Sequence, residues 1–515
     1  MRTRLAGAVV VAAAFAASTA AFAERPEPAE TAPDVRHCAL EIRPDPASGR
    51  LRVGATLDIA NPSAVTEFSY YLADWYDSVQ VASREGPAAV THENGVVTVR
   101  VERPSVEERL VFALSGVPGA SADDPRPVFA DSSIYLVWSD RFYPVDFDDW
   151  TLVSVRIEMP PGFRALAPGR RTSAERQGDV SVESFETSQP IRAATVIADR
   201  RWVETERTVF GLTMRTLLYA DTQHRAEEIF QTSGDVLAFY ESRFGPYAFD
   251  EFTFAIVEGI YARRALAGAV IYSPKYLAGE FETTGHDAHE TALLWWFYTI
   301  AGRGPGSYQW IEGFGDYAEM LYDEARGLPI PGNFEKYRDG YLRMAGTSEE
   351  PPITAPRGPL AGNFIHGRLP WLMHLVRFAA GDSAFDAGVR HLFDRWRFRS
   401  FTLDEFVSTL SEGTGQPLDW WRDEWLHRGG VPEIAWHADI TTDPAGGFRV
   451  EVAVGQTGAL YRLPLEIGID SEVGMIYQRV RLDEKSASFQ FRSTLRPTRI
   501  VLDPRRWLLA KITEE

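Results

Sequence analysis

The sequence predicts a multidomain α+β protein with an N-terminal antiparallel β domain, a mainly helical central domain and a C-terminal β-sandwich. Changes in hydrophobic period are the main basis of this prediction. Apolar residues alternate with others over residues 36–215, take a helical spacing over residues 216–430, and alternate again over residues 431–515. At 515 residues with 45% hydrophobic content, the chain is long enough for about three domains with cores of their own.

The N-terminal β domain is predicted from apolar residues at every second position, because this spacing gives a strand one buried face. One such run contains Val97, Val99 and Val101, and the turn residues Glu93-Asn94-Gly95 stand before it. A second run ends before Pro160-Pro161-Gly162, and its apolar positions are Val153, Val155, Ile157 and Met159.

The central domain is predicted to be mainly helical with a few strands. A helix should end at Gly245-Pro246, because glycine and proline stop helices. Strands are expected over residues 252–257 and 269–272. The segment 345–363 is rich in proline and glycine and is predicted to be a long loop, after which helices resume near Trp371. The apolar residues of the first helix share one face: Ile229, Val236, Leu237, Tyr240 and Phe244.

The C-terminal region returns to strand-like alternation after Val431-Pro432-Glu433. Two long runs with one apolar face each are typical of a β-sandwich. Their apolar positions are Phe448, Val450, Val452 and Val454, and then Tyr461, Leu463, Leu465, Ile467 and Ile469.

The first residues have the features of an export signal. Arg2 and Arg4 form a basic start, an Ala/Val-rich run follows, and Ala21-Phe22-Ala23 fits a cleavage site. Residues 1–23 are therefore predicted to be a signal peptide, with an uncleaved membrane anchor as the alternative. Residues 24–35, rich in proline and acidic residues, should form a disordered leader. The mature protein is expected to be exported, either periplasmic or extracellular, without a membrane span.

Charge and cysteine content exclude some classes of function. The formal net charge of −19 and the absence of a basic run argue against a nucleic-acid partner. Cys38 is the only cysteine, so an intrachain disulfide is excluded and the fold must depend on core packing. No Gly-x-Ser-x-Gly pattern supports a serine nucleophile.

One stretch of the central domain has most of the features of a zinc peptidase site. His289-Glu290 would begin a His-Glu-x-x-His pattern, in which two histidines on one helical face bind the metal and the glutamate takes a proton from the metal-bound water. Glu312 lies where a third ligand from a neighbouring helix is expected. The second histidine is missing, because Leu293 occupies its position.

The spacing of eighteen residues between position 293 and Glu312, together with Trp295, Trp310 and Glu312-Gly313-Phe314, resembles the zinc aminopeptidases of the gluzincin type. This family includes membrane alanyl aminopeptidase and leukotriene A hydrolase. The resemblance covers residues 35–515 and implies a thermolysin-like helical domain between the two β domains. It also implies that His289 and Glu312 are metal ligands and that Glu290 is the catalytic base. Further similarities lie at Tyr143-Pro144, at Phe244-Gly245-Pro246-Tyr247, and at Gly381-Asp382 with Phe385.

Three positions depart from the family pattern. Leu293 replaces a metal ligand. The family's Gly-x-Met-Glu-Asn segment, whose glutamate holds the amino group of the substrate, should fall at residues 263–268, but this segment reads Arg-Arg-Ala-Leu-Ala-Gly, with Ala265 among the mismatches. The family's oxyanion-stabilising tyrosine best matches Phe364, which has no hydroxyl. Losing a ligand and an oxyanion donor together makes ordinary aminopeptidase turnover improbable.

Two functional hypotheses follow. The first is an exported pseudopeptidase with a degenerate zinc site and no cofactor, which binds a peptide or protein in its central cleft. The second is an active zinc-dependent hydrolase that uses Glu290 as base and a replacement ligand such as His286, three residues before His289. His366 lies near the expected cleft and is a weaker candidate for acid–base work, with packing or a surface position as the alternative.

Overall fold

The computed structural model describes residues 32–120, 126–260, 263–278, 286–304, 307–330, 332–351 and 360–515. The chain forms two compact units, each considered by itself. The first comprises Met1–Tyr308 with Trp396–Phe401, and the second comprises Gln309–Arg395 with Thr402–Glu515. Among the described residues, no helix has both the length and the apolar character needed to cross a membrane. The predicted signal peptide and most of the predicted leader lie outside the described residues.

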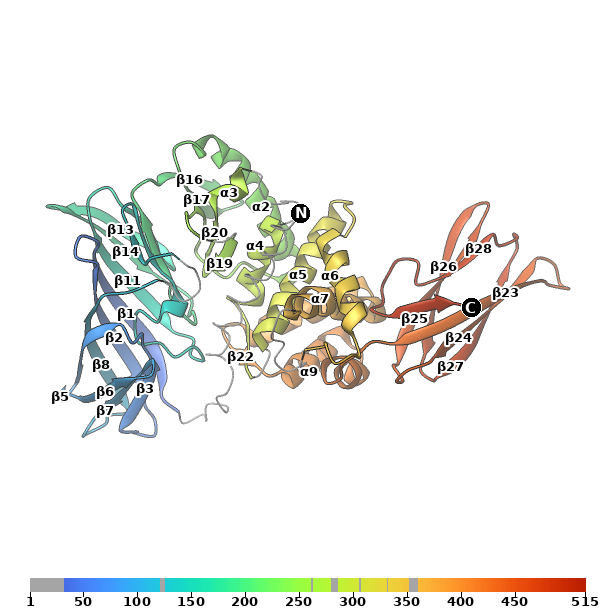
Figure 1. Cartoon of the computed structure of the whole chain (residues 1–515), viewed down its shortest axis with the longest axis horizontal. Coiled ribbons are helices and arrows are strands. Elements are labelled where there is room, and N and C mark those ends of the chain that lie inside the picture. Colours follow the sequence, from blue (N-terminus) through green and yellow to red (C-terminus); the bar gives the residue numbers. More distant parts are fainter. Residues whose placement is uncertain are drawn as a thin grey trace. The chain divides into compact units, whose positions relative to one another are not determined.

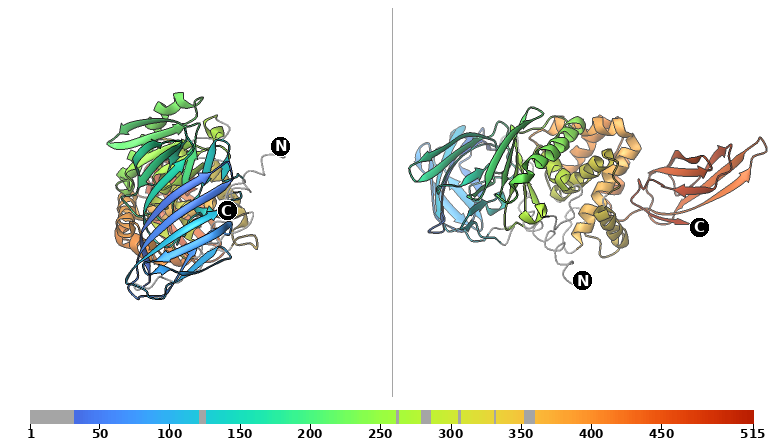
Figure 2. Two further views of the ribbon diagram at one scale, coloured as in Figure 1. Left: turned by 90° about the vertical axis from the view of Figure 1, so that its left-hand side faces the viewer. Right: turned by 90° about the horizontal axis from the view of Figure 1, so that it is seen from above.

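The largest sheet has eight strands in the order β13-β14-β11-β1-β2-β8-β4-β5 (Figures 1 and 2). Most pairs are antiparallel as predicted, but β1 and β11 run parallel. Val35 is buried in β1, so the first strand starts within the segment predicted to be a leader. The strands are β1 (Asp34–Asp45), β2 (Arg50–Ala60), β4 (Tyr76–Ser83), β5 (Gly86–Pro87), β8 (Glu107–Gly116), β11 (Leu152–Met159), β13 (Arg170–Gln177) and β14 (Val180–Glu186).

Two smaller sheets accompany the large one, in the orders β12-β15-β10-β9 and β3-β7-β6. The predicted alternation is confirmed in β7 and β11, where every second residue is buried. The strands are β3 (Glu67–Tyr71), β6 (Ala89–Glu93), β7 (Val96–Arg100), β9 (Phe129–Ala130), β10 (Ser133–Leu136), β12 (Arg164–Leu166) and β15 (Val196–Asp199), with a 3-10 turn at Trp138–Asp140.

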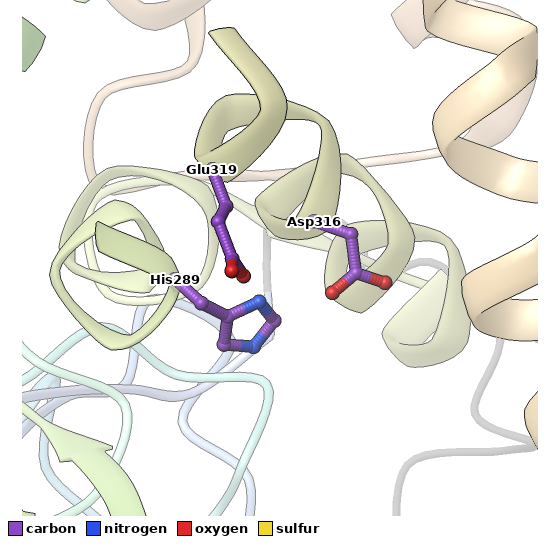
Figure 3. A group of neighbouring side chains, drawn as sticks. All are labelled: His289, Asp316 and Glu319. Carbon is purple, nitrogen blue, oxygen red and sulfur yellow. The ribbon is translucent and has the colours of Figure 1, made fainter. Parts of the chain in front are cut away.

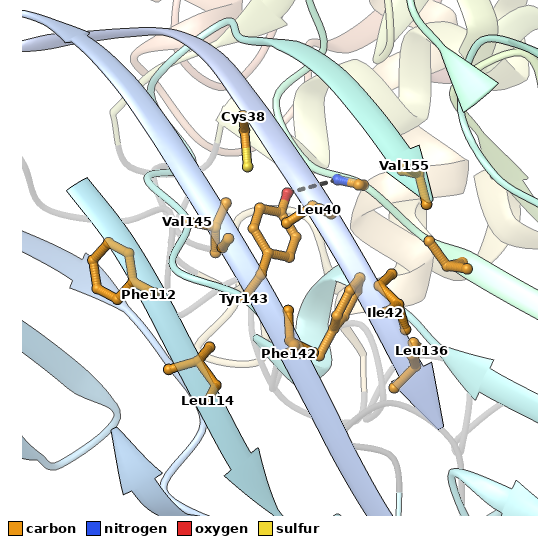
Figure 4. Packing of buried hydrophobic residues seen from close by; sticks show 14 of the residues in the cluster. Cys38, Leu40, Ile42, Phe112, Leu114, Leu136, Phe142, Tyr143, Val145 and Val155 are labelled. Carbon is orange, nitrogen blue, oxygen red and sulfur yellow. Dashed lines mark hydrogen bonds between the residues drawn. The ribbon is translucent and has the colours of Figure 1, made fainter. Parts of the chain in front are cut away.

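The core between these strands is apolar and includes the single cysteine (Figure 4). Cys38 is 2% exposed, and its burial raises the pKa of the thiol well above the ordinary value. The buried hydroxyl of Tyr143 accepts a hydrogen bond from the Ala194 amide at 2.8 Å. The one polar group of this ring is therefore satisfied inside the core, as buried polar atoms require.

A five-stranded sheet in the order β16-β17-β18-β20-β19 completes the first unit. The strands predicted over 252–257 and 269–272 are present as β18 and β20. The predicted domain boundary between residues 215 and 216 falls inside β17, which pairs in parallel with β18. The strands are β16 (Val203–Val209), β17 (Leu212–Leu218), β18 (Glu251–Ile256), β19 (Arg263–Leu266) and β20 (Ala269–Tyr272), and the two-residue β21 (Ala301–Gly302) pairs with β22 (Ser400–Phe401).

The helices of the first unit begin with a 3-10 turn and include the helix with His289-Glu290. The predicted helix before Gly245-Pro246 is confirmed as α2, whose apolar face is buried and which ends at Gly245, where φ is 101°. That positive φ suits glycine, which has no Cβ. The elements are the turn Gln223–Arg225, α2 (Ala226–Phe244), α3 (Pro274–Leu277) and α4 (His286–Trp296).

The second unit begins with a helical region. The prediction of a loop to residue 363 was wrong at its end, because α7 starts at Ala361 and contains Pro370. Thr402 and Glu405 form a reciprocal cap at the start of α9, where the Thr402 amide donates to Glu405 at 2.8 Å. The helices are α5 (Ser307–Ala325), α6 (Gly332–Met344), α7 (Ala361–Ala380), α8 (Asp382–Trp396), α9 (Leu403–Thr414) and α10 (Asp419–Trp421), followed by a π-turn at Arg422–Leu426.

The C-terminal part of the second unit contains two sheets, β27-β24-β23-β29 and β26-β25-β28. The apolar positions predicted in both long runs are largely buried, including Val452 and Leu465, each 0% exposed. The strands are β23 (Glu433–Thr442), β24 (Phe448–Gln456), β25 (Leu463–Ser471), β26 (Gly474–Leu482), β27 (Ser486–Ser493), β28 (Arg499–Leu502) and β29 (Lys511–Glu514).

Candidate functional site

Helix α4 is held firmly within the first unit. The Tyr240 hydroxyl on α2 donates to the Ala288 carbonyl at 3.0 Å, and the Trp295 indole donates to the Gly245 carbonyl at 3.1 Å. The rings of Tyr240 and Trp295 also pack edge to face. Contacts at both ends of the helix therefore fix the orientation of the residues between them.

The three residues of interest on α4 are all buried. His289 is 2% exposed, Glu290 is 6% exposed and Leu293 is 8% exposed. Leu293 lies one turn after His289, on the same side of the helix. Its isobutyl side chain has no atom that can bind a metal, so α4 offers one imidazole where the predicted pattern needs two. The backbone of α4 starts at His286, but the His286 side chain lies outside the described part of the structure.

The carboxylate of Glu290 forms an ion pair with Arg263 on β19. The guanidinium Nε of Arg263 donates to Oε1 of Glu290 at 2.8 Å, with the arginine side chain 24% exposed and the glutamate side chain 7% exposed. Sequence reasoning noted Arg263 only as a mismatch with the family pattern. It did not predict this contact, because the two residues are 27 positions apart and no local motif links them.

Strand β19 continues with a second arginine, Arg264, and then with the short or apolar Ala265 and Leu266. Ala265, at the position where the family carries its amine-binding glutamate, is 3% exposed and pairs with Val270 of β20. Its carbonyl accepts a hydrogen bond from the Tyr298 hydroxyl at 2.8 Å. This contact ties the strand to the segment that follows α4.

Helix α5 carries four carboxylates at helical spacing, and a functional role was predicted only for the first of them, Glu312. Glu312 is half-buried, whereas Asp316, Glu319 and Asp323 are 1% to 2% exposed. Spacings of four, three and four residues put all four on one helical face. That periodicity is visible in the sequence, but the family motif points only to Glu312. Burial raises the pKa of Asp323 above its ordinary value.

Asp316 has a basic partner on α7. The Nδ1 atom of His366 lies 2.7 Å from Oδ2 of Asp316, and the imidazole packs against the Tyr337 ring at 5.1 Å. His366 is therefore part of a polar pair. Phe364, two residues earlier, is 0% exposed and packs edge to face with Tyr341.

Three of the residues named above form a group that could bind a metal ion (Figure 3). His289, Asp316 and Glu319 each offer one ligand atom, and these atoms lie within 4.8 Å of one another. Glu312 is not in this group, so its role as a metal ligand stays a prediction, as does the catalytic role of Glu290. On α4 itself the residues do not fit the zinc site that the resemblance implies. Leu293 supplies no ligand, and Arg263 places a cation beside the expected base.

Comparison with known proteins defines an aminopeptidase-type fold for this chain. In particular, it matches the crystal structure of Legionella pneumophila aminopeptidase A in complex with aspartic acid, with a TM-score of 0.77 and 14% sequence identity. The match covers 94% of this chain and 60% of that chain.

A sequence relative gives a second, shorter match. Aminopeptidase N of Lactococcus lactis subsp. lactis is 27% identical over 97 residues, which are 18% of this chain and 11% of the relative. No family model matches the chain. The matched length is thus below two thirds of either relative, and a likeness at this level of identity establishes the fold and not the chemistry.

Proposed function

We propose that this protein is exported and uses its aminopeptidase-type fold to bind a peptide or protein without hydrolysing it. The observation that carries the proposal is Leu293. It is buried on α4 beside His289 and Glu290, where a second imidazole would be needed to hold a catalytic zinc. Loss of an outer-shell partner typically costs about 10–100-fold in metal affinity. Loss of a direct ligand should cost more.

Two further positions support the absence of hydrolysis. The resemblance matches Phe364 to an oxyanion-stabilising tyrosine, and its ring is enclosed by other aromatic side chains. Removing one oxyanion donor typically lowers the rate by about 100–1,000-fold. The resemblance also matches β19 to the segment that holds the amino group of a substrate, and Ala265 offers only a methyl group there.

The expected class of ligand follows from the relatives. Both are named as aminopeptidases, so their fold accommodates the end of a peptide chain. This chain keeps that fold over 94% of its length. A peptide or a protein segment in the central cleft is therefore the partner that the retained architecture favours.

Metal content and turnover test this proposal directly. Elemental analysis of the purified protein should find zinc well below one ion per chain, and a panel of aminoacyl-coumarin substrates should remain uncleaved. Fluorescence anisotropy with a panel of labelled peptides should detect saturable binding. Stoichiometric zinc together with chelator-sensitive cleavage that is lost in Glu290→Gln would overturn the proposal.

A metal-dependent hydrolase is the second candidate, and the group in Figure 3 favours it. His289, Asp316 and Glu319 are chemically suited to a divalent ion even though position 293 is apolar. This candidate predicts metal-dependent cleavage that is lost in His289→Ala and in Asp316→Asn. If a replacement imidazole at position 286 completes the site, His286→Ala should abolish the cleavage as well.

Export has its own test. The proposal is that residues 1–23 are removed and that the mature protein lies in the periplasm or outside the cell. Cell fractionation followed by N-terminal sequencing should find a chain that starts at Glu24. A full-length chain in the cytoplasmic fraction would contradict the proposal.

A further inference from the structure

Arg263 lies beside Glu290 on a strand of a sheet. It begins β19, the edge strand of its sheet, and pairs with Tyr272 of β20. The strand is tied to the segment after α4 by the hydrogen bond between the Tyr298 hydroxyl and the Ala265 carbonyl. The guanidinium therefore projects from a fixed backbone toward Glu290 and is not carried by a free surface loop.

The chain after β18 is held in place at Glu258. The Glu258 amide donates to the Tyr219 hydroxyl at 3.0 Å, and the Glu258 side chain forms an ion pair with Arg201. Arg201 is in turn held by Asp199, whose Oδ2 accepts from Nη2 at 2.7 Å. These contacts hold the chain at Glu258, which follows β18.

A buried carboxylate needs a positive charge nearby, because an uncompensated buried charge is costly. In a zinc peptidase the metal supplies that charge beside the base. The Glu290 side chain is 7% exposed, and its partner is the guanidinium of Arg263. A guanidinium in this place also repels a divalent ion, since like charges in a partly dry site interact strongly.

We propose that Arg263 is an internal cation that takes over the electrostatic role of a metal at α4: it neutralises Glu290 and keeps divalent ions away from His289. This inference rests on the proposed non-catalytic function and deepens it, because it assigns the loss of metal binding to two residues acting together. Leu293 removes a ligand, and Arg263 supplies the charge that the ion would have brought. Restoring the histidine alone is then not enough to restore metal binding.

Zinc titration calorimetry on four chains tests this: the wild type, Leu293→His, Leu293→His with Arg263→Gln, and Leu293→His with Arg263→Lys. The histidine variants contain an i, i+4 imidazole pair within the first unit, a suitable geometry for zinc. The chain with glutamine at 263 should bind zinc at least about tenfold more tightly than Leu293→His alone, because a neighbouring positive charge has been removed. The chain with lysine at 263 keeps that charge and should behave like Leu293→His.

Equal zinc affinity in Leu293→His and in the double variant with Arg263→Gln would overturn the role given to Arg263. If the metal-free double variant is not folded, circular dichroism with added zinc replaces calorimetry. Recovery of the folded spectrum then supports the inference, and failure to recover overturns it. Failure of the proposed function would look different, because stoichiometric zinc would already be present in the wild type.

Discussion

Helices α4 and α5 both bury carboxylates, but the two helices compensate them with different partners. On α4, Glu290 is paired with Arg263, a residue that stays charged at every accessible pH. On α5, Asp316 is paired with His366, a residue type whose charge changes near neutral pH. The first partner is a guanidinium and the second is an imidazole, so the two carboxylates are compensated by different chemical groups.

This difference bears on the proposed absence of hydrolysis. A base that must accept a proton is poorly served by a fixed guanidinium 2.8 Å away. The proposed absence of hydrolysis therefore depends on α4, whereas α5 keeps a polar pair with a histidine.

The largest expected effect comes from breaking the pair of Glu290 with Arg263. Arg263→Ala leaves Glu290 buried without its cation, and removing one partner of a buried ion pair costs about 3–5 kcal/mol. Because Arg263 is 24% exposed, we expect the lower end, about 3 kcal/mol, in the free energy of unfolding measured with urea.

The matched control is Arg263→Ala combined with Glu290→Gln. This double variant removes both charges and should recover most of the lost stability, since a neutral amide is cheaper to bury than a carboxylate. Equal stability of Arg263→Ala and the wild type would show that the ion pair contributes nothing and would remove the contrast between the two helices.

A smaller loss is expected on α5. His366→Phe keeps the ring that packs on Tyr337 but removes the hydrogen bond to Asp316, and bonds to charged groups contribute about 1.5–3 kcal/mol. We expect a decrease of about 2 kcal/mol in urea unfolding. Asp316→Asn, which keeps a hydrogen-bond acceptor, should lose less. A larger loss in Asp316→Asn than in His366→Phe would show that the carboxylate has another, stronger partner.

The α+β class and most strands could be predicted because a strand with one buried face needs period two and a helix needs a period near 3.6. Val97, Val153 and Leu237 all follow this rule and are buried. The parallel pairing of β1 with β11 could not be predicted in this way, because hydrophobic period does not encode which strands become neighbours. The start of α7 was placed too late because the proline- and glycine-rich segment 345–363 was taken as a loop to its end, whereas the helix begins at Ala361 and accommodates Pro370.

The candidate site was only partly predictable. The missing second histidine at Leu293 could be predicted from the sequence alone, since the spacing of ligands on a helix is a local property. The partners of Glu290 and Asp316 come from residues 27 and 50 positions away, and such contacts depend on the tertiary fold. Asp316, Glu319 and Asp323 could have been found from their helical spacing, which is as regular as the pattern used to choose Glu312.

The smallest effect extends the comparison to a carboxyl group surrounded by acids. Asp149 accepts a hydrogen bond from the Val35 amide at 3.2 Å, next to the start of β1. Burial and then the neighbouring Asp146, Asp34 and Asp148 raise the pKa of Asp149 to about 8. In the unfolded chain the pKa of an aspartate is about 3.9. The folded protein therefore binds the extra proton between these two values, and its stability should fall as the pH rises through this window.

Asp149→Asn removes that titration while keeping an oxygen for the Val35 amide. The variant and the wild type should unfold at similar temperatures near pH 4, and the variant should be the more stable of the two at pH 9, measured by thermal unfolding across the series. Asp77→Asn is the control, because the pKa of exposed Asp77 is lowered by its hydrogen bond with Arg50. That variant should not gain stability as the pH rises. If Asp149→Asn gains nothing at pH 9, a cation compensates Asp149 in the folded protein, and its position would then resemble that of Glu290.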